Sequence, residues 1–186
     1  MDQQNTNRDN ISDDVPQWYV LRFLYRDQPQ VRERLRQNGI KIFTPTKTVV
    51  TVRHGRRIRM QVPVIWDLLF VCSTRTELDP YVRACPYVQY KYKLGGKYCE
   101  PIVVPERQMN EFIAAVESTE NPIYLTPDEV DLSKGSRVRL IGGPMDGLEC
   151  TLLKVKGARA KRLIVEIPDT LIAAIEVQPD LIEIIN

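Results

Sequence analysis

The sequence predicts an α+β protein in two parts, an α/β sandwich of helices on an antiparallel sheet and then a small all-β barrel. In residues 17–117, strand-like segments alternate with segments of helical periodicity. Beyond residue 132 only short apolar segments remain, separated by glycine and proline, which is typical of a small barrel. We therefore predict a disordered tail at 1–16, the sandwich at 17–117, a linker at 118–132 and the barrel at 133–186.

The first elements are a strand, a helix and a second strand. Trp18–Phe23 is aromatic and β-branched, which favours a strand. Asp27 is placed to cap a helix that has Pro29 in its first turn and Gly39 just past its end. Ile40–Phe43 then predicts the second strand.

A hairpin and a central strand follow. Lys47–Val62 predicts a hairpin, since Val50 and Val52 lead up to a turn at His54 and Gly55 and apolar residues alternate with Arg57, Arg59 and Gln61 on the return; glycine permits the positive φ that such a turn requires. The continuous apolar run Trp66–Val71 predicts a central strand of the sheet.

Two further helices complete the sandwich. Thr76 and Asp79 have the spacing of a capping box, so we expect the second helix to begin there. Gln89–Lys93 predicts a short strand, and Pro105 begins a third helix with apolar residues at helical spacing.

The predicted linker contains two prolines, several acidic residues and no sustained periodicity. The barrel strands that follow are separated by Gly142-Gly143-Pro144, Gly157 and Pro168. The five predicted strands are Arg137–Ile141, Glu149–Val155, Leu163–Ile167, Leu171–Val177 and Leu181–Ile185.

Few residues in this chain suit catalysis or metal binding. None of the four cysteines forms a C-x2-C pair, and His54 is the single histidine. We expect no metal, no cofactor and no enzymatic activity, although a nucleic-acid-processing activity stays open as an alternative. No apolar run approaches the roughly 20 residues of a spanning helix, and residues 1–17 are polar, so we expect a soluble cytoplasmic protein that does not bind membranes.

Charge is unevenly distributed along the chain. Residues 22–61 contain 11 Lys and Arg but 2 acidic residues, whereas residues 120–186 contain 8 basic and 11 acidic residues. A basic segment in a chain of net charge +2 is typical of a protein with a polyanionic partner. A solvated charged face explains the charge equally well.

Two segments carry a resemblance to a known family. The run from Lys134 to Glu149 resembles the KOW motif, with Gly142, Gly143, Pro144 and Gly147 at its turn. Trp18-Tyr19-Val20-Leu21, the basic helix, Phe43-Thr44-Pro45, the basic hairpin and Leu68-Leu69-Phe70-Val71 resemble, in that order, the NGN domain of the NusG family. The order NGN, linker, KOW is similar to that of NusG-like transcription factors, and most of all to the UpxY- and RfaH-type specialised paralogues.

The resemblance implies a non-enzymatic factor that binds the clamp helices of RNA polymerase and suppresses pausing or termination, in polysaccharide biosynthesis operons. Members of this family dock through an apolar patch on the NGN sheet. Strand alternation puts Trp66, Leu68 and Phe70 on one face and Leu69 and Val71 on the other. With the two equivalent positions on the first strand, the implied polymerase-binding residues are Val20, Arg22, Trp66, Leu68 and Phe70. An ordinary core is the alternative for the apolar members.

The resemblance also implies contact with non-template or upstream DNA. Base-reading positions fall on Arg34, Gln37 and Asn38, since arginine and amide side chains suit bidentate contacts with bases. We expect phosphate contacts from Arg32, Arg36 and Lys41, and Arg83 to line the same surface. The hairpin tip, with Arg53, His54, Arg56 and Arg57, is expected to contact upstream DNA without sequence preference. A solvated amphipathic helix is the alternative for each helical residue.

For the barrel, the resemblance implies a ribosomal protein or a termination factor as partner, and a monomeric chain. The alternative function is that of a KOW-type RNA-binding protein in ribosome assembly or translation. Such a protein would need no apolar docking patch.

Overall fold

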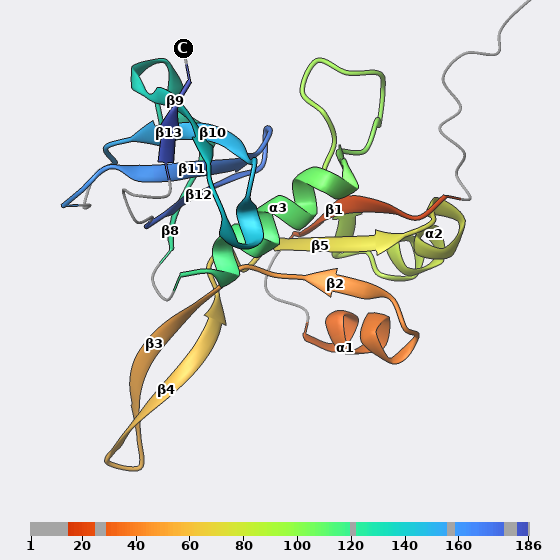
Figure 1. The fold of residues 1–186 in the computed structure, drawn as a ribbon. Helices are drawn as coiled ribbons and strands as arrows, with labels where there is room; N and C mark the ends of the chain where they lie inside the picture. The colour runs from red at the N-terminus through yellow and green to blue at the C-terminus, as the bar shows by residue number, and fades with distance from the viewer. Residues whose placement is uncertain (1–14, 25–28, 120–121, 156–158, 177–181, 186) are drawn as a thin grey trace, which may run out of the picture. The chain divides into compact units, whose positions relative to one another are not determined.

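The computed structural model describes residues 15–24, 29–119, 122–155, 159–176 and 182–185 (Figure 1). It confirms the α+β class, with α-helices and antiparallel sheets. Its contacts form two compact units: Met1–Thr44 with Ile65–Val103, and Pro45–Val64 with Val104–Asn186. Among the described residues, no helix is long and apolar enough to span a bilayer. The predicted tail lies outside these residues up to position 14.

The first unit contains a sheet of strand order β2-β5-β1-β6, with all three of these pairings antiparallel. A further short strand, β7, pairs with β1. The sequence predicted the four strands of the main order but not β7, which is two residues long. The bounds are β1 Gln17–Phe23, β2 Lys41–Phe43, β5 Leu68–Ser73, β6 Val88–Tyr90 and β7 Val103–Val104.

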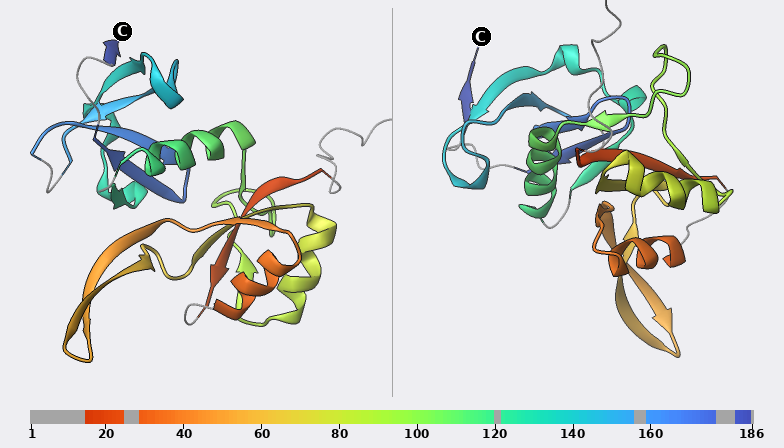
Figure 2. Two further views of the ribbon diagram at one scale, coloured as in Figure 1. Left: turned by 60° about the horizontal axis from the view of Figure 1, so that its bottom comes forward. Right: turned by 90° about the vertical axis from the view of Figure 1, so that its right-hand side faces the viewer.

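Two helices, α1 (Pro29–Gln37) and α2 (Arg75–Ala84), cover one face of this sheet (Figure 2). Leu35 of α1 and Leu78 of α2 pack into one buried cluster with the side chains of alternate strand positions. The strand residues of this cluster include Tyr19, Leu21, Phe23, Leu69 and Val71. The predicted alternation along β5 is therefore confirmed, because Leu69 and Val71 face the helices.

Two element boundaries differ from the predictions. β5 begins at Leu68, and Trp66 lies in the turn before it. α2 begins two residues earlier than expected, because the hydroxyl of Thr74, rather than that of Thr76, accepts a hydrogen bond from the backbone N–H of Glu77 (3.1 Å). Asp27, the predicted cap of α1, lies outside the described residues.

The predicted hairpin is present as a separate two-stranded sheet of β3 (Thr46–Arg53) and β4 (Arg56–Pro63). His54 and Gly55 form its turn with φ angles of 50° and 73°. Figure 2 shows the pair as a long twisted ribbon.

The second unit also contains a six-stranded antiparallel sheet, of order β13-β9-β10-β11-β12-β8. Helix α3 (Glu106–Glu117) lies against β11 and β12, and its buried residues include Met109 and Phe112. The bounds are β8 Ile123–Leu125, β9 Ser136–Leu140, β10 Glu149–Leu153, β11 Arg162–Ile167, β12 Leu171–Ile175 and β13 Ile182–Ile184. All five predicted barrel strands are therefore present.

The segment predicted as a linker contains regular structure. β8 pairs with β12, and two short 3₁₀ turns (Pro127–Glu129 and Leu132–Lys134) follow it. We expected no strand here, because a three-residue strand between prolines leaves no periodic pattern. The domain boundaries themselves stay predictions.

Candidate nucleic-acid interface

The end of helix α1 presents a polar, basic stripe to the solvent. Leu35 is buried against the sheet, so the positions around it turn outward, and Arg34, Gln37 and Asn38 follow one another at i, i+3 and i+4. All three are exposed, as is Arg36. Arginines in the last turn also interact favourably with the carbonyl end of the helix. The structure therefore brings together the three predicted base-reading residues.

Local contacts hold these side chains in place. Asn38 Nδ2 donates a hydrogen bond to the Arg34 carbonyl oxygen (2.7 Å), and Gln37 Nε2 donates to Glu33 Oε1 (3.1 Å). The Arg34 guanidinium lies 5.8 Å from the centre of the Tyr81 ring, across a groove of about 640 Å³ between α1 and α2. The side chains are therefore oriented before any ligand binds, and because each amide nitrogen carries two hydrogens, these bonds leave a second N–H able to contact a base.

Arg32 corrects one of the predictions. Its side chain is buried at 6% exposure, its guanidinium lies 5.0 Å from the centre of the Phe23 ring, and Nη2 donates a long hydrogen bond to the Leu68 carbonyl oxygen (3.5 Å). Desolvation, and then the nearby charge of Arg36, lower the pKa of Arg32. A buried guanidinium does not neutralise a phosphate, so Arg32 belongs to the core.

Lys41, a predicted phosphate contact, and Arg83, predicted to line the same surface, are both exposed. Lys41 Nζ lies 5.2 Å from the centre of the Trp18 ring. Lys41 and Trp18 each stand opposite Cys72 in the strand register. The Lys41 side chain therefore leaves the sheet on the face that α1 and α2 do not cover. Arg83, in the last turn of α2, pairs with Asp79 (3.2 Å).

The predicted polymerase-binding residues also lie together, with one exception. Val20 stands directly opposite Phe70 and Arg22 directly opposite Leu68, so these four form one patch on the face opposite to the helices. Trp66 lies outside the strand and is therefore not fixed to this face by alternation.

The expected exposure of this patch is wrong for its apolar members. Val20 and Phe70 are fully buried and Leu68 is 5% exposed, whereas Trp66 is 47% exposed. Arg22 is exposed as well, and its Nε pairs with Asp67 Oδ2 (3.2 Å). Alternation identifies the face of a strand, but it does not say whether that face reaches solvent.

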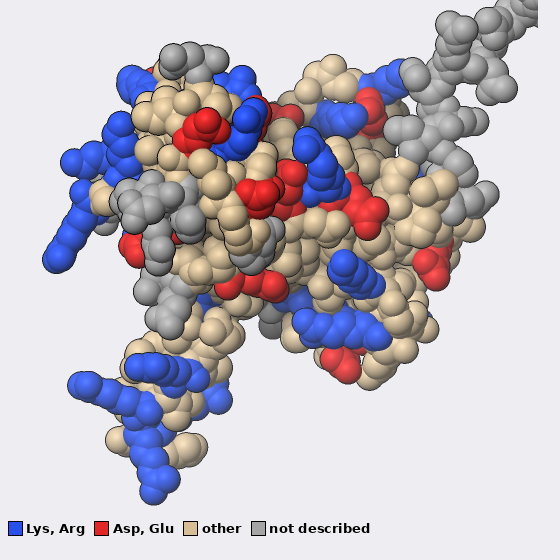
Figure 3. Space-filling view, viewed as in Figure 1, with Lys and Arg blue, Asp and Glu red and all other residues tan. Residues whose placement is uncertain are grey.

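The hairpin is the most basic element of the described chain. Residues 34–66 contain no acidic residue. The exposed basic residues of β3, β4 and their turn gather on this ribbon in Figure 3. The lysine and arginines are Lys47, Arg53, Arg56, Arg57 and Arg59, and His54 in the turn is exposed as well. Such a ribbon is suited to phosphate contacts.

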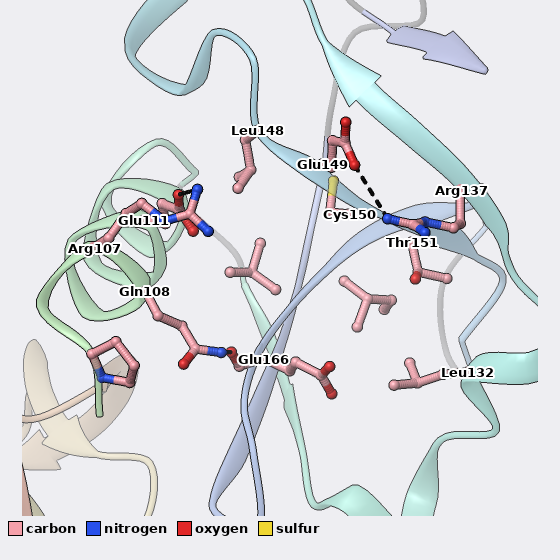
Figure 4. A pocket seen from close by; sticks show the side chains of 13 residues that line it. Arg107, Gln108, Glu111, Leu132, Arg137, Leu148, Glu149, Cys150, Thr151 and Glu166 are labelled. Atoms are coloured by element: carbon pink, nitrogen blue, oxygen red, sulfur yellow. Dashed lines mark hydrogen bonds and ion pairs between the residues drawn. The ribbon is translucent and has the colours of Figure 1, made fainter. Parts of the chain in front are cut away.

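A second cavity, of about 440 Å³, lies between α3 and the sheet of the second unit (Figure 4). Gln108 Nε2 donates to the Glu166 carbonyl oxygen (3.2 Å), and Glu149 pairs with Arg137 (3.2 Å). Burial raises the pKa of the Cys150 thiol to about 11, so the thiol is protonated at neutral pH and is a poor nucleophile. Among the described residues, no cluster of three or more His, Cys, Asp and Glu could hold a metal ion.

The KOW-like turn has the geometry that its glycines allow. Gly142, Gly143 and Gly147 have φ angles of 77°, 72° and 77°, a region that other residues rarely adopt. The backbone N–H of Gly147 donates a hydrogen bond to the Leu140 carbonyl oxygen (2.9 Å), which closes the turn between β9 and β10. The glycines are therefore required by the backbone.

Comparison with known proteins gives one family. The family described as transcription termination factor nusG matches residues 16–132. No curated protein matches the sequence. Among solved structures, the chain is similar to one in the crystal structure of the MjSpt4:Spt5 complex in conformation B, with 12% identity over 90% of this chain and 96% of that chain. The TM-score of that match is 0.25, so it carries no argument about fold or function.

Proposed function

Because this chain belongs to the NusG family of transcription factors, we propose that it binds RNA polymerase and suppresses pausing or termination during elongation. The observation that carries the proposal is the family match over residues 16–132. That range includes the basic stripe of α1, the patch on the sheet and the hairpin.

We propose that this chain docks on the clamp helices of RNA polymerase. The docking residues would be Val20, Arg22, Trp66, Leu68 and Phe70. Trp66 and Arg22 are the exposed members, and tryptophan and arginine are enriched among the residues that dominate binding at protein interfaces. Docking through all five residues requires that the three buried side chains become accessible. Trp66 is therefore the residue whose role can be tested most directly.

We assign DNA contact to two elements of the chain. Arg34, Gln37 and Asn38 would read bases of the non-template strand, and Arg36 would neutralise a phosphate. The hairpin would contact upstream duplex DNA without sequence preference. Lys41 is exposed and remains a proposed phosphate contact, and exposed Arg83 remains a proposed member of the same surface, whereas Arg32 is withdrawn because it is buried.

The finer assignment follows the resemblance. If the turn at Gly142–Gly147 belongs to a KOW domain, the second unit would bind a ribosomal protein or a termination factor. The resemblance to UpxY- and RfaH-type paralogues suggests that the chain acts on the transcription of polysaccharide biosynthesis operons.

An elongation assay tests the proposal. Polymerase is walked through an operon leader that contains an intrinsic pause and a terminator, with and without the full chain. We expect shorter pauses and more read-through with the protein. The double variant Arg34→Ala, Gln37→Ala should lose this effect on the leader, whereas Gln30→Ala, an exposed glutamine at the other end of α1, should retain it.

Two results would count against the proposal. Unchanged pausing and read-through at saturating protein would contradict the elongation role. Recovery of ribosomal particles but no polymerase in a pull-down with the full chain would favour the alternative role in ribosome assembly or translation.

A further inference from the structure

A loop of the first unit exposes two large side chains almost completely. It connects β6 and β7 and is visible as the green loop at the top of Figure 1. Tyr98 is 97% exposed and Leu94 is 91% exposed, more than any other large apolar side chain of the described residues. Neither is part of the surfaces assigned above.

The loop is held by its own hydrogen bonds. Tyr92 and Pro101 form an isolated antiparallel bridge, and the backbone N–H of Lys93 donates to the Glu100 carbonyl oxygen (2.9 Å). The Glu100 carboxylate pairs with the Lys93 ammonium and accepts a hydrogen bond from the backbone N–H of Lys97 (3.1 Å). These two contacts lower the pKa of Glu100, so the carboxylate stays charged at neutral pH. The loop therefore presents Tyr98 from a fixed frame.

Aromatic and basic residues alternate around this frame. Residues 80–105 contain five of the eight tyrosines of the chain, together with four basic residues and one acidic residue. Within the loop, Tyr92 and Tyr98 are interspersed with Lys91, Lys93 and Lys97. Proteins that bind single-stranded nucleic acid combine such elements, since aromatic rings stack on unpaired bases and lysines neutralise the backbone.

We propose that the loop of residues 91–101 binds single-stranded nucleic acid, with an unpaired base stacked on the Tyr98 ring and a phosphate beside Lys97. A duplex hides its base faces, so the loop should discriminate against it. A protein partner is a weaker explanation, because a stable protein interface buries roughly 800 Å² on each side and one ring, one leucine and two glycines offer far less. The tip residues next to Leu94 are Gly95 and Gly96.

Fluorescence anisotropy with the full chain tests this site. The probes are labelled oligo(dT) and oligo(U) single strands of about 15 nucleotides, with a labelled 15-base-pair duplex for comparison. Because one base–aromatic stack contributes about 1–3 kcal/mol, Tyr98→Ala should weaken single-strand binding about tenfold and leave duplex binding unchanged. The two single strands show whether the loop prefers DNA or RNA.

Three variants separate stacking from other roles. Tyr98→Phe keeps the ring and should bind as the original chain does, whereas Tyr98→Leu keeps apolar bulk and should fail as Tyr98→Ala does. Tyr87→Ala, which removes a tyrosine that lies outside the loop and is 47% exposed, should have no effect. Because Tyr98 is almost entirely exposed, its replacement should leave the fold intact, which circular dichroism can verify.

The site is disproved if the unaltered chain does not bind single strands, if Tyr98→Leu binds normally, or if Tyr98→Ala weakens duplex and single-strand binding equally. Loss of polymerase binding with Tyr98→Ala, without loss of oligonucleotide binding, would instead assign the loop to a protein partner and also overturn the proposal. The anisotropy assay contains no polymerase, so its outcome is independent of the proposed elongation role.

Discussion

At the scale of single residues, the arginines of α1 divide between core and solvent. Arg32 lies three positions before the fully buried Leu35, on the side of the helix that faces the sheet, whereas Arg34 and Arg36 flank Leu35 and point outward. The spacing from Leu35 was a signal for burial. Arginine is seldom buried, so the sequence predicted that Arg32 is exposed. The apolar stem of arginine nevertheless packs well against a ring such as that of Phe23.

We expect Arg32→Ala to lower the free energy of unfolding by about 1–3 kcal/mol, because it removes the packing on Phe23 and the contact with the Leu68 carbonyl. Arg36→Ala, which changes an exposed residue of the same helix, should alter it by less than about 0.5 kcal/mol. Urea unfolding of both variants measures the difference. Equal destabilisation would show that the burial of Arg32 has no energetic consequence.

At the scale of elements, the start of α2 depends on one hydroxyl. Thr74 has extended backbone angles (φ −77°, ψ 156°) and its side chain accepts from the Glu77 N–H, whereas Thr76 is already within the helix. Thr74→Ala should therefore cost about 1 kcal/mol of unfolding free energy, and Thr76→Ala much less. Thermal or urea unfolding distinguishes the two. A larger cost for Thr76→Ala would restore the cap that the sequence predicted.

The elements that the sequence predicted correctly have long or strongly patterned segments. Alternation identified β3 and β4, and helical spacing identified α3. β7 and β8 were missed because two or three residues carry no period, whereas the equally short β2 and β6 overlap the longer predicted segments Ile40–Phe43 and Gln89–Lys93. The start of β5 was misplaced because Trp66 begins an apolar run, and only tertiary structure separates the turn from the strand.

The hairpin is an element whose proposed role rests on charge alone. Arg57 and Arg59 stand opposite Val52 and Val50, so both arginines share one face of the ribbon. We expect the double variant Arg57→Ala, Arg59→Ala to weaken duplex binding and to reduce the slope of log K against log [salt] by about 1.8, since each lost phosphate contact removes about 0.9. Titration of a labelled duplex at several salt concentrations measures this slope.

A matched control for the hairpin is Val50→Thr, Val52→Thr, which changes the same face without changing its charge. It should leave the salt slope as it is. If removal of the two arginines leaves the slope unchanged as well, the hairpin does not contact phosphates, and its basic residues are a solvated face.

At the scale of the whole molecule, the accessibility of the sheet of the first unit limits how a partner can bind it. Its sheet has one face packed against helices and a second face with Val20, Leu68 and Phe70 buried in the present structure. A partner that binds this second face must replace whatever contacts bury these side chains, and burial of apolar surface contributes about 25 cal/mol per Å². Trp66 carries no such requirement because it is already half exposed.

We therefore expect Trp66→Ala to weaken binding to a stalled elongation complex by about 30-fold, the effect of removing an interface residue that contributes about 2 kcal/mol. Tyr87→Ala is the control, because Tyr87 is also 47% exposed but lies outside the proposed docking surface. A native gel shift with purified polymerase measures both affinities. Equal affinities for the two variants would remove Trp66 from the interface. Docking would then depend on Arg22 and the three buried residues, so an apolar contact with polymerase would require exposure of Val20, Leu68 and Phe70.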